Sequence, residues 1–189
     1  MIRLHLGCGK INLDGWVNID KYCTTADVLD DMITLDSIKE NSVDEIYSSH
    51  AIEHLLPNLF LKGLKKWYRL LKVNGVLIVR CPNANFHLNY WLKLGDNEKF
   101  KDSLAKKPKG FLDGILGFQN RGEGYRNRNL FTKGILLKYV ELVGFKTLCK
   151  EVSARSPILL NDLKCGKSDE GIIYPDFPIR DLWCRGIKE

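Results

Sequence analysis

Two short stretches near the amino terminus carry residue types suited to binding a nucleoside. The first ends in Gly7-Cys8-Gly9, which follows alternating apolar residues typical of a buried strand. Glycines allow a tight turn and let a ligand approach the backbone without a Cβ in the way. The second stretch, residues 16–20, ends in Asp20, whose carboxylate can accept hydrogen bonds from both hydroxyls of a ribose. A glycine turn beside this carboxylate predicts a nucleoside site, in which Cys8 is a small filler rather than a nucleophile.

Two histidines further along the chain are candidates for removing a proton. His50 and His54 follow an apolar run at residues 43–48, and their spacing would place both on one side of a helix. Imidazole titrates near neutral pH, so either residue is a candidate base; packing or contact with a cofactor is the alternative role for His50. With Glu53 they form the HxxEH spacing of some zinc helices, but the rest of such a site is missing, and we predict no metal.

The elements expected to position these residues alternate along the chain. Strands are predicted at residues 2–7, 16–20, 26–29, 43–48, 76–79, 145–152 and 181–187. Helices are predicted from Pro57 to the Asn74-Gly75 turn, at residues 86–94 and at residues 133–143, with a single helical turn at 36–39. Thr132 is suited to cap the last helix and Gly144 to end it. This order predicts an α/β fold with a doubly wound, mostly parallel sheet and an antiparallel edge strand.

Residues 95–129 break the alternation. They are rich in Gly, Lys, Asn and Arg, and between Lys99 and Arg128 they hold eight basic and three acidic side chains. A segment this irregular inside a compact domain is typical of a lid or a binding loop. We expect a lid or acceptor-binding insertion whose charge suits an anionic substrate, with a solvated basic surface as the alternative.

The bulk composition is that of an ordinary globular domain. At 189 residues, with 44% hydrophobic and 28% charged residues, the chain is expected to form a single domain over residues 1–189. No apolar run approaches the roughly 20 residues of a membrane span, and the strand-like first residues indicate no signal peptide. The six cysteines contain no CxxC pair, which favours a reduced, cytoplasmic setting. The oligomeric state stays open.

These pieces, in this order, resemble the class I S-adenosylmethionine (SAM) dependent methyltransferases. Gly7-Cys8-Gly9 resembles their glycine motif, and Asp20 resembles the acidic residue on the ribose of SAM. The segment after the third strand resembles the one that holds adenine. This implies that Asp31 contacts the exocyclic amine and that the Met32 backbone contacts the ring. A turn or capping role is the alternative for Asp31, because Asp30 competes for the same contact.

The resemblance continues into the middle of the chain. Residues 42–55 resemble the fourth-strand motif, whose end, at Ser49 and His50, faces the methionine part of the cofactor. Residues 71–82 resemble the helix end, Asn-Gly turn and fifth strand of the family. The family resemblance implies a compact Rossmann-like fold, SAM as cofactor and methyl transfer as the reaction.

Within that family, the pattern GCG…GWxNID…EH is most similar to small predicted bacterial methyltransferases associated with surface-polysaccharide synthesis. This similarity implies transfer of a methyl group to an oxygen or nitrogen of a small or carbohydrate-type acceptor, such as a glycan precursor. One departure is that relatives often carry a histidine just before the late helix, where residues 125–129 are YRNRN.

Three other functions fit parts of the pattern. A nicotinamide-dependent (NAD-type) oxidoreductase would use a similar glycine turn, but the third glycine of GxGxxG is missing and no first helix is expected. A non-catalytic SAM-binding protein is the second option. A nucleic-acid methyltransferase is disfavoured, because the base-flipping Asn/Asp-Pro-Pro motif belongs at the fourth strand, where residues 48–51 are SSHA.

Overall fold

The computed structural model describes residues 1–99, Leu116, residues 126–152 and residues 181–189. The strands are β1 (Arg3–Leu6), β2 (Val17–Asp20), β3 (Val28–Leu29), β4 (Val43–Ser49), β5 (Leu71–Pro82), β6 (Phe145–Val152) and β7 (Asp181–Lys188). The labelled helices are α1 (Pro57–Leu70), α2 (Ala84–Lys93), α5 (Lys133–Leu142) and the short 3₁₀ helix η1 (Ile52–His54). Most of the predicted insertion at 95–129 lies outside the described residues.

The strands form one seven-stranded sheet in the order β3-β2-β1-β4-β5-β7-β6. The first five strands pair in parallel, whereas β7 runs antiparallel to both β5 and β6. The predicted doubly wound, mostly parallel sheet is thereby confirmed. One detail differs: β7 inserts between β5 and β6, so the antiparallel strand lies one place inside the edge, and β6 forms the edge itself.

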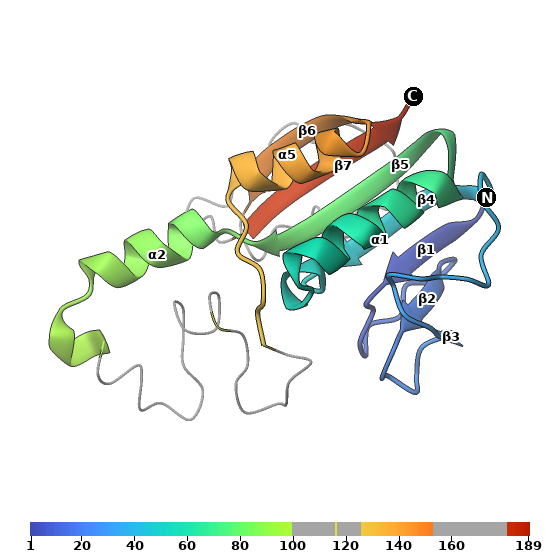
Figure 1. The fold of residues 1–189 in the computed structure, drawn as a ribbon. Coiled ribbons are helices and arrows are strands. Elements are labelled where there is room, and N and C mark those ends of the chain that lie inside the picture. The colour runs from blue at the N-terminus through green and yellow to red at the C-terminus, as the bar shows by residue number, and fades with distance from the viewer. Residues whose placement is uncertain (100–115, 117–125, 153–180) are drawn as a thin grey trace.

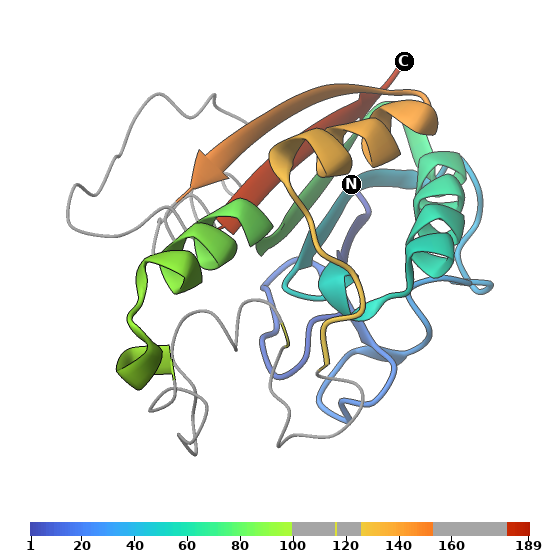
Figure 2. The same ribbon diagram turned by 60° about the vertical axis from the view of Figure 1, so that its left-hand side comes forward.

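Helices α1 and α5 lie over one face of the sheet (Figure 1, Figure 2). Side chains of a strand alternate between the two faces, so every second strand residue packs under these helices. In β5, Leu77 and Val79 belong to this core, whereas Ile78 points to the opposite face. The apolar series of α1 supplies Phe60, Leu64, Trp67 and Leu70 to the core. The cluster on the opposite face contains Trp16, Tyr47, Ile78 and Trp183.

The helix boundaries follow local capping chemistry except at the end of α1. Thr132 caps α5 as predicted, since its Oγ1 accepts a hydrogen bond from the Ile135 amide at 3.3 Å. The predicted end of α1 at Asn74-Gly75 is wrong, because the helix stops at Leu70. Leu71 is already extended and pairs with Val43 of β4, so sheet pairing ends the helix one turn early. The predicted helical turn at 36–39 is a turn without helix.

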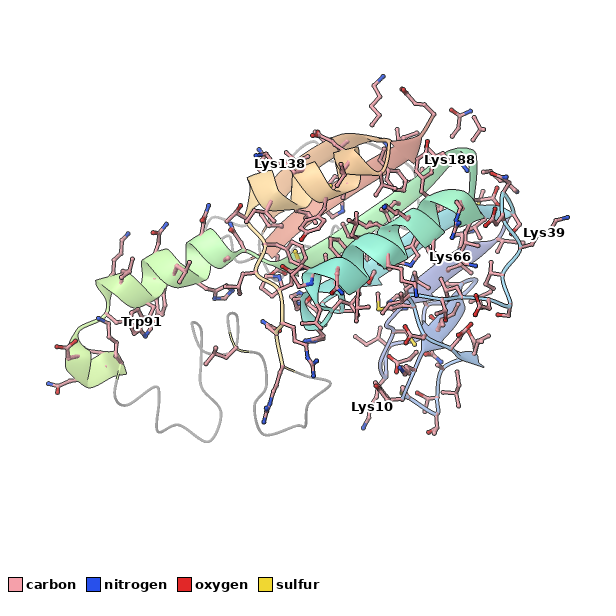
Figure 3. All side chains as sticks on the ribbon, viewed as in Figure 1. Lys10, Lys39, Lys66, Trp91, Lys138 and Lys188 are labelled. Atoms are coloured by element: carbon pink, nitrogen blue, oxygen red, sulfur yellow. The ribbon has the colours of Figure 1, made fainter. Side chains whose placement is uncertain are left out.

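Short connections join the first four strands. Residues 7–16, 21–27 and 30–42 contain turns and no helix, which confirms the expected short first crossover. Because the first five strands run parallel, their carboxyl ends meet at one edge of the sheet, where α/β folds bind their ligands. Lys10 marks this edge in Figure 3, and Lys39 marks the opposite one. No helix within the described ranges is long and apolar enough to cross a membrane.

Candidate functional site

The turn after β1 contains two glycines with different surroundings. Gly7 and Gly9 both have left-handed backbones, with φ of +67° and +54°. A Cβ on Gly7 would lie 2.5 Å from the Cβ of Ala51 and 3.7 Å from the sulfur of Met32, so this side of the turn is tightly packed. A Cβ on Gly9 would meet nothing within 4 Å. The turn is therefore open at Gly9, where a ligand can approach the backbone.

Asp20, at the end of β2, is tied to the glycine turn. Its Oδ2 accepts a hydrogen bond from the Gly9 amide at 2.9 Å, which joins the two predicted parts of the nucleoside site. Its Oδ1 accepts from the amides of Tyr22 and Cys23 at 2.8 and 2.9 Å. A carboxylate offers about four acceptor positions, so one position remains, on Oδ2 beside Gly9. The arrangement thus supports a direct bond to one ribose hydroxyl rather than to both.

Asp31 caps the turn that follows β3, which is the alternative to an adenine contact that the sequence left open for it. Its Oδ1 accepts from the Ile33 amide at 2.9 Å, and its Oδ2 pairs with Nζ of Lys21 at 2.9 Å. The next residue, Met32, has its carbonyl held by the indole N–H of buried Trp67 at 2.6 Å. No acceptor for the Met32 amide is found among the residues that the structure describes. This amide is available to bind a ligand next to the glycine turn.

Cys8 and Ser49 complete the set of residues expected around the cofactor. Cys8 is buried, and burial, followed by the nearby Asp20 carboxylate, raises the pKa of its thiol to about 11. The thiol is therefore protonated at neutral pH, which agrees with its interpretation as a small filler. Ser49 is the last residue of β4 and pairs with Arg80 of β5, so it lies at the same edge of the sheet as the glycine turn.

His50 turns the chain out of β4 and is held between two carboxylates. Its Nε2 lies 3.1 Å from Oδ2 of Asp181, and its Nδ1 lies 3.5 Å from Oε1 of Glu53. Burial lowers the pKa of His50, but the hydrogen bonds to Asp181 and Glu53 outweigh it and raise the pKa to about 10. An imidazolium has no lone pair with which to accept a proton. In this state the His50 ring donates hydrogen bonds to its carboxylate neighbours.

His54 ends η1 and has a different partner. Its Nδ1 lies 3.3 Å from the carbonyl oxygen of Arg126. Because a carbonyl only accepts, Nδ1 carries the hydrogen, and Nε2 of the neutral ring keeps its lone pair. The shared helical face expected for the two histidines is not formed, since His50 precedes the 3₁₀ helix and has a φ of +51°. The two rings therefore have different partners, carboxylates for His50 and a backbone carbonyl for His54.

The HxxEH spacing assembles no metal site. His50 pairs with Glu53, while His54 faces the backbone of Arg126. Within the described part of the chain, no three side chains of the metal-binding types come together.

Comparisons with known proteins bear on this geometry. Residues 11–79 match a family model described as a methyltransferase domain. A SAM-dependent methyltransferase from Archaeoglobus fulgidus has the same fold, at 15% identity and a TM-score of 0.56, with 98% of this chain and 85% of that chain covered. A methyltransferase from Thermotoga maritima, described as a possible histamine N-methyltransferase, gives 15% identity and a TM-score of 0.57, with coverage of 100% and 82%. No curated protein sequence matches the chain.

One further solved structure contains the cofactor itself. Phosphoethanolamine N-methyltransferase 2 of Haemonchus contortus was solved in complex with SAM. The match has 15% identity and a TM-score of 0.55, and it covers 100% of this chain and 48% of the Haemonchus contortus chain. The fold places the glycine turn and Asp20 at the carboxyl edge of the sheet. The fold is that of SAM-dependent methyltransferases of known structure, and residues 11–79 match the methyltransferase domain model.

Three side chains that shape the site were missed by sequence reasoning. Trp67 is hidden in the apolar series of α1, where only its burial is predictable. Arg80 carries a signal, since an arginine inside the apolar run VLIVRCP predicts a buried partner. That partner, Asp181, is 101 residues away in the sequence, and no local pattern connects the two.

Proposed function

We propose that the carboxyl edge of the sheet holds SAM in one orientation. The ribose lies at Asp20, the adenine at Asp31 and the Met32 amide, and the methionine end at Ser49 and His50. The glycine turn lies beneath the cofactor. The open space at Gly9 and the remaining acceptor position of Asp20 support this assignment. A Cβ added to Gly7 would lie 3.7 Å from the Met32 sulfur, so Met32 lies close to the glycine turn, which supports neighbouring positions for adenine and ribose.

We propose that the enzyme transfers the methyl group of SAM to an oxygen or nitrogen of a small or carbohydrate-type acceptor. Bound SAM supplies an electrophilic methyl group on its sulfonium. A hydroxyl or amine acceptor must also lose a proton, and His54 is proposed to take it at Nε2. The observation that carries this role is the 3.3 Å contact between His54 Nδ1 and the Arg126 carbonyl, which places the hydrogen of the neutral ring on Nδ1 and its lone pair on Nε2.

The acceptor class and setting are inferred from the sequence pattern. The similarity to methyltransferases of surface-polysaccharide synthesis supports a glycan precursor, and the basic residues 99–128 suit an anionic one. Among similar structures, one is a phosphoethanolamine N-methyltransferase and another is described as a possible histamine N-methyltransferase, which supports a small acceptor. We place the enzyme in the cytoplasm, because Cys8, Cys23, Cys81, Cys149 and Cys184 are free thiols.

Turnover with labelled SAM against amines, amino sugars and nucleotide sugars tests this proposal. The informative variant is His54→Asn, because the asparagine amide can still donate to the Arg126 carbonyl but has no atom at Nε2. We expect kcat to fall by about 10²–10⁴-fold, with an unchanged Kd for S-adenosylhomocysteine. A variant that turns over like the wild type would remove His54 from the reaction, and a wild type that does not bind SAM would refute the whole assignment.

A second candidate is a protein that binds SAM without transferring its methyl group. The absence of a histidine in residues 125–129 favours it, because relatives often carry one there. In that case calorimetry shows S-adenosylhomocysteine binding, and no acceptor in the panel is methylated. A nicotinamide oxidoreductase is disfavoured by the structure, since the glycine turn leads into no helix that could bind a pyrophosphate.

A further inference from the structure

Four charged side chains meet beneath the end of β4. Arg80 donates from Nε to Oδ2 of Asp181 at 2.7 Å, and its Nη2 lies 2.6 Å from the same oxygen. His50 lies between this pair and Glu53, at 3.1 Å from Asp181 and 3.5 Å from Glu53. Arg80, Asp181 and Glu53 are nearly inaccessible to solvent, at 2%, 2% and 3% exposure. We call Arg80, Asp181, His50 and Glu53 the charged cluster.

The charged cluster surrounds a strained point of the backbone. His50 is a non-glycine residue with a φ of +51°, and its amide donates to the Arg80 carbonyl at 2.9 Å. A left-handed backbone disfavours an L-residue, so it persists only where the surroundings determine it. Here the imidazole is held from both sides by carboxylates. The side-chain contacts and the strained turn therefore support each other.

The strained turn leads directly to the proposed base. Glu53 lies next to His54 in η1, and its carbonyl accepts from the amides of Arg128 and Asn129 at 2.7 and 3.0 Å. The same segment supplies the carbonyl of Arg126 that orients His54. Any shift of the turn at His50 would therefore move His54 relative to this carbonyl.

We propose that Asp181 is a positioning residue for methyl transfer: from β7 it holds His50 in the strained turn, and through Glu53 this turn sets the orientation of His54. Asp181 itself touches no reacting atom. The effect of Asp181 on the rate of methyl transfer rests on the proposed function, whereas its effect on the orientation of His54 does not. The charged cluster is balanced when His50 is an imidazolium, with two cations facing two carboxylates. A neutral His50 would leave one buried carboxylate uncompensated.

NMR of the imidazole nitrogens tests the orientation without any acceptor. The chain has only four histidines, so each ring can be assigned by substitution. In the wild type we expect a doubly protonated His50 through neutral pH and a His54 with its hydrogen on Nδ1. In Asp181→Asn, we expect His50 to lose its proton at lower pH and His54 to become a mixture of tautomers. Asp44→Asn, which removes an ion pair with Lys72 at the other end of β4, is the control and leaves both rings unchanged.

A second variant covers the case in which Asp181→Asn does not fold. His50→Gly removes the imidazole and relieves the left-handed backbone at position 50. We expect the His54 tautomer to change as in Asp181→Asn and kcat to fall at least about tenfold. A His54 tautomer that stays on Nδ1 in this variant overturns the proposal. Equal rates for His54→Asn and the wild type would instead refute only the proposed base.

Discussion

Replacing Gly7 by alanine should mainly destabilise the protein, whereas the same change at Gly9 should mainly weaken cofactor binding. Both residues have left-handed backbones, and an alanine there costs about 1–2 kcal/mol. At Gly7 the new Cβ would also lie 2.5 Å from the Cβ of Ala51. Overpacking of this kind costs about 1–3 kcal/mol more. We therefore expect the free energy of unfolding to fall by about 2–5 kcal/mol in Gly7→Ala and by about 1–2 kcal/mol in Gly9→Ala.

Denaturation and calorimetry with S-adenosylhomocysteine separate the two effects. For a chain of this length the melting temperature should fall on the order of 10 °C in Gly7→Ala and about 4 °C in Gly9→Ala. The added methyl of Gly9→Ala enters the open space where the cofactor is proposed to approach, so the Kd should rise at least about tenfold, which corresponds to about 1.4 kcal/mol. Gly7→Ala should show the smaller loss of affinity. Equal losses of stability, or wild-type affinity in Gly9→Ala, would refute this reasoning.

Three further predictions follow from single contacts. Asp20→Ala removes the acceptor of the Gly9, Tyr22 and Cys23 amides, so we expect calorimetry to show at least about tenfold weaker S-adenosylhomocysteine binding. Asp14→Ala, at an exposed position, is the control, and equal affinities of the two variants would contradict the assignment. Trp67→Phe keeps the aromatic core but loses the 2.6 Å bond to the Met32 carbonyl, so the free energy of unfolding in urea should fall by about 1–2 kcal/mol, whereas Trp91→Phe should have little effect. His50→Gln tests the imidazolium: because the folded pKa is about 10 and the ordinary value is 6.5, the stability from His50 is complete below pH 6.5 and is lost as the pH rises toward 10. The stability difference between wild type and His50→Gln should shrink over this window, and a difference independent of pH would exclude the charged imidazole.

Local sequence patterns were sufficient to predict most helices and strands of the fold. The branched apolar run at 76–79 lies within β5, and the Thr132 cap and Gly144 bracket α5 as predicted. These features depend on side-chain periodicity and backbone capping, which act within a few residues. The end of α1 was missed because pairing of Leu71 with Val43 overrides the local Asn-Gly signal. The position of β7 inside the edge was missed for the same reason, since strand order depends on contacts between distant segments.

The sequence by itself predicted that the glycine turn and Asp20 lie together, and the bond between the Gly9 amide and Asp20 shows that they do, because both act through the backbone turn that they form. Only the tertiary structure distinguished the two histidines. His50 and His54 are the same residue type four positions apart, yet one faces two carboxylates and the other a backbone carbonyl. The carboxylate of Asp181 comes from a strand 131 residues away, so no local pattern contains it. The protonation of an imidazole depends on the charges around it, and those charges are set by the folded chain.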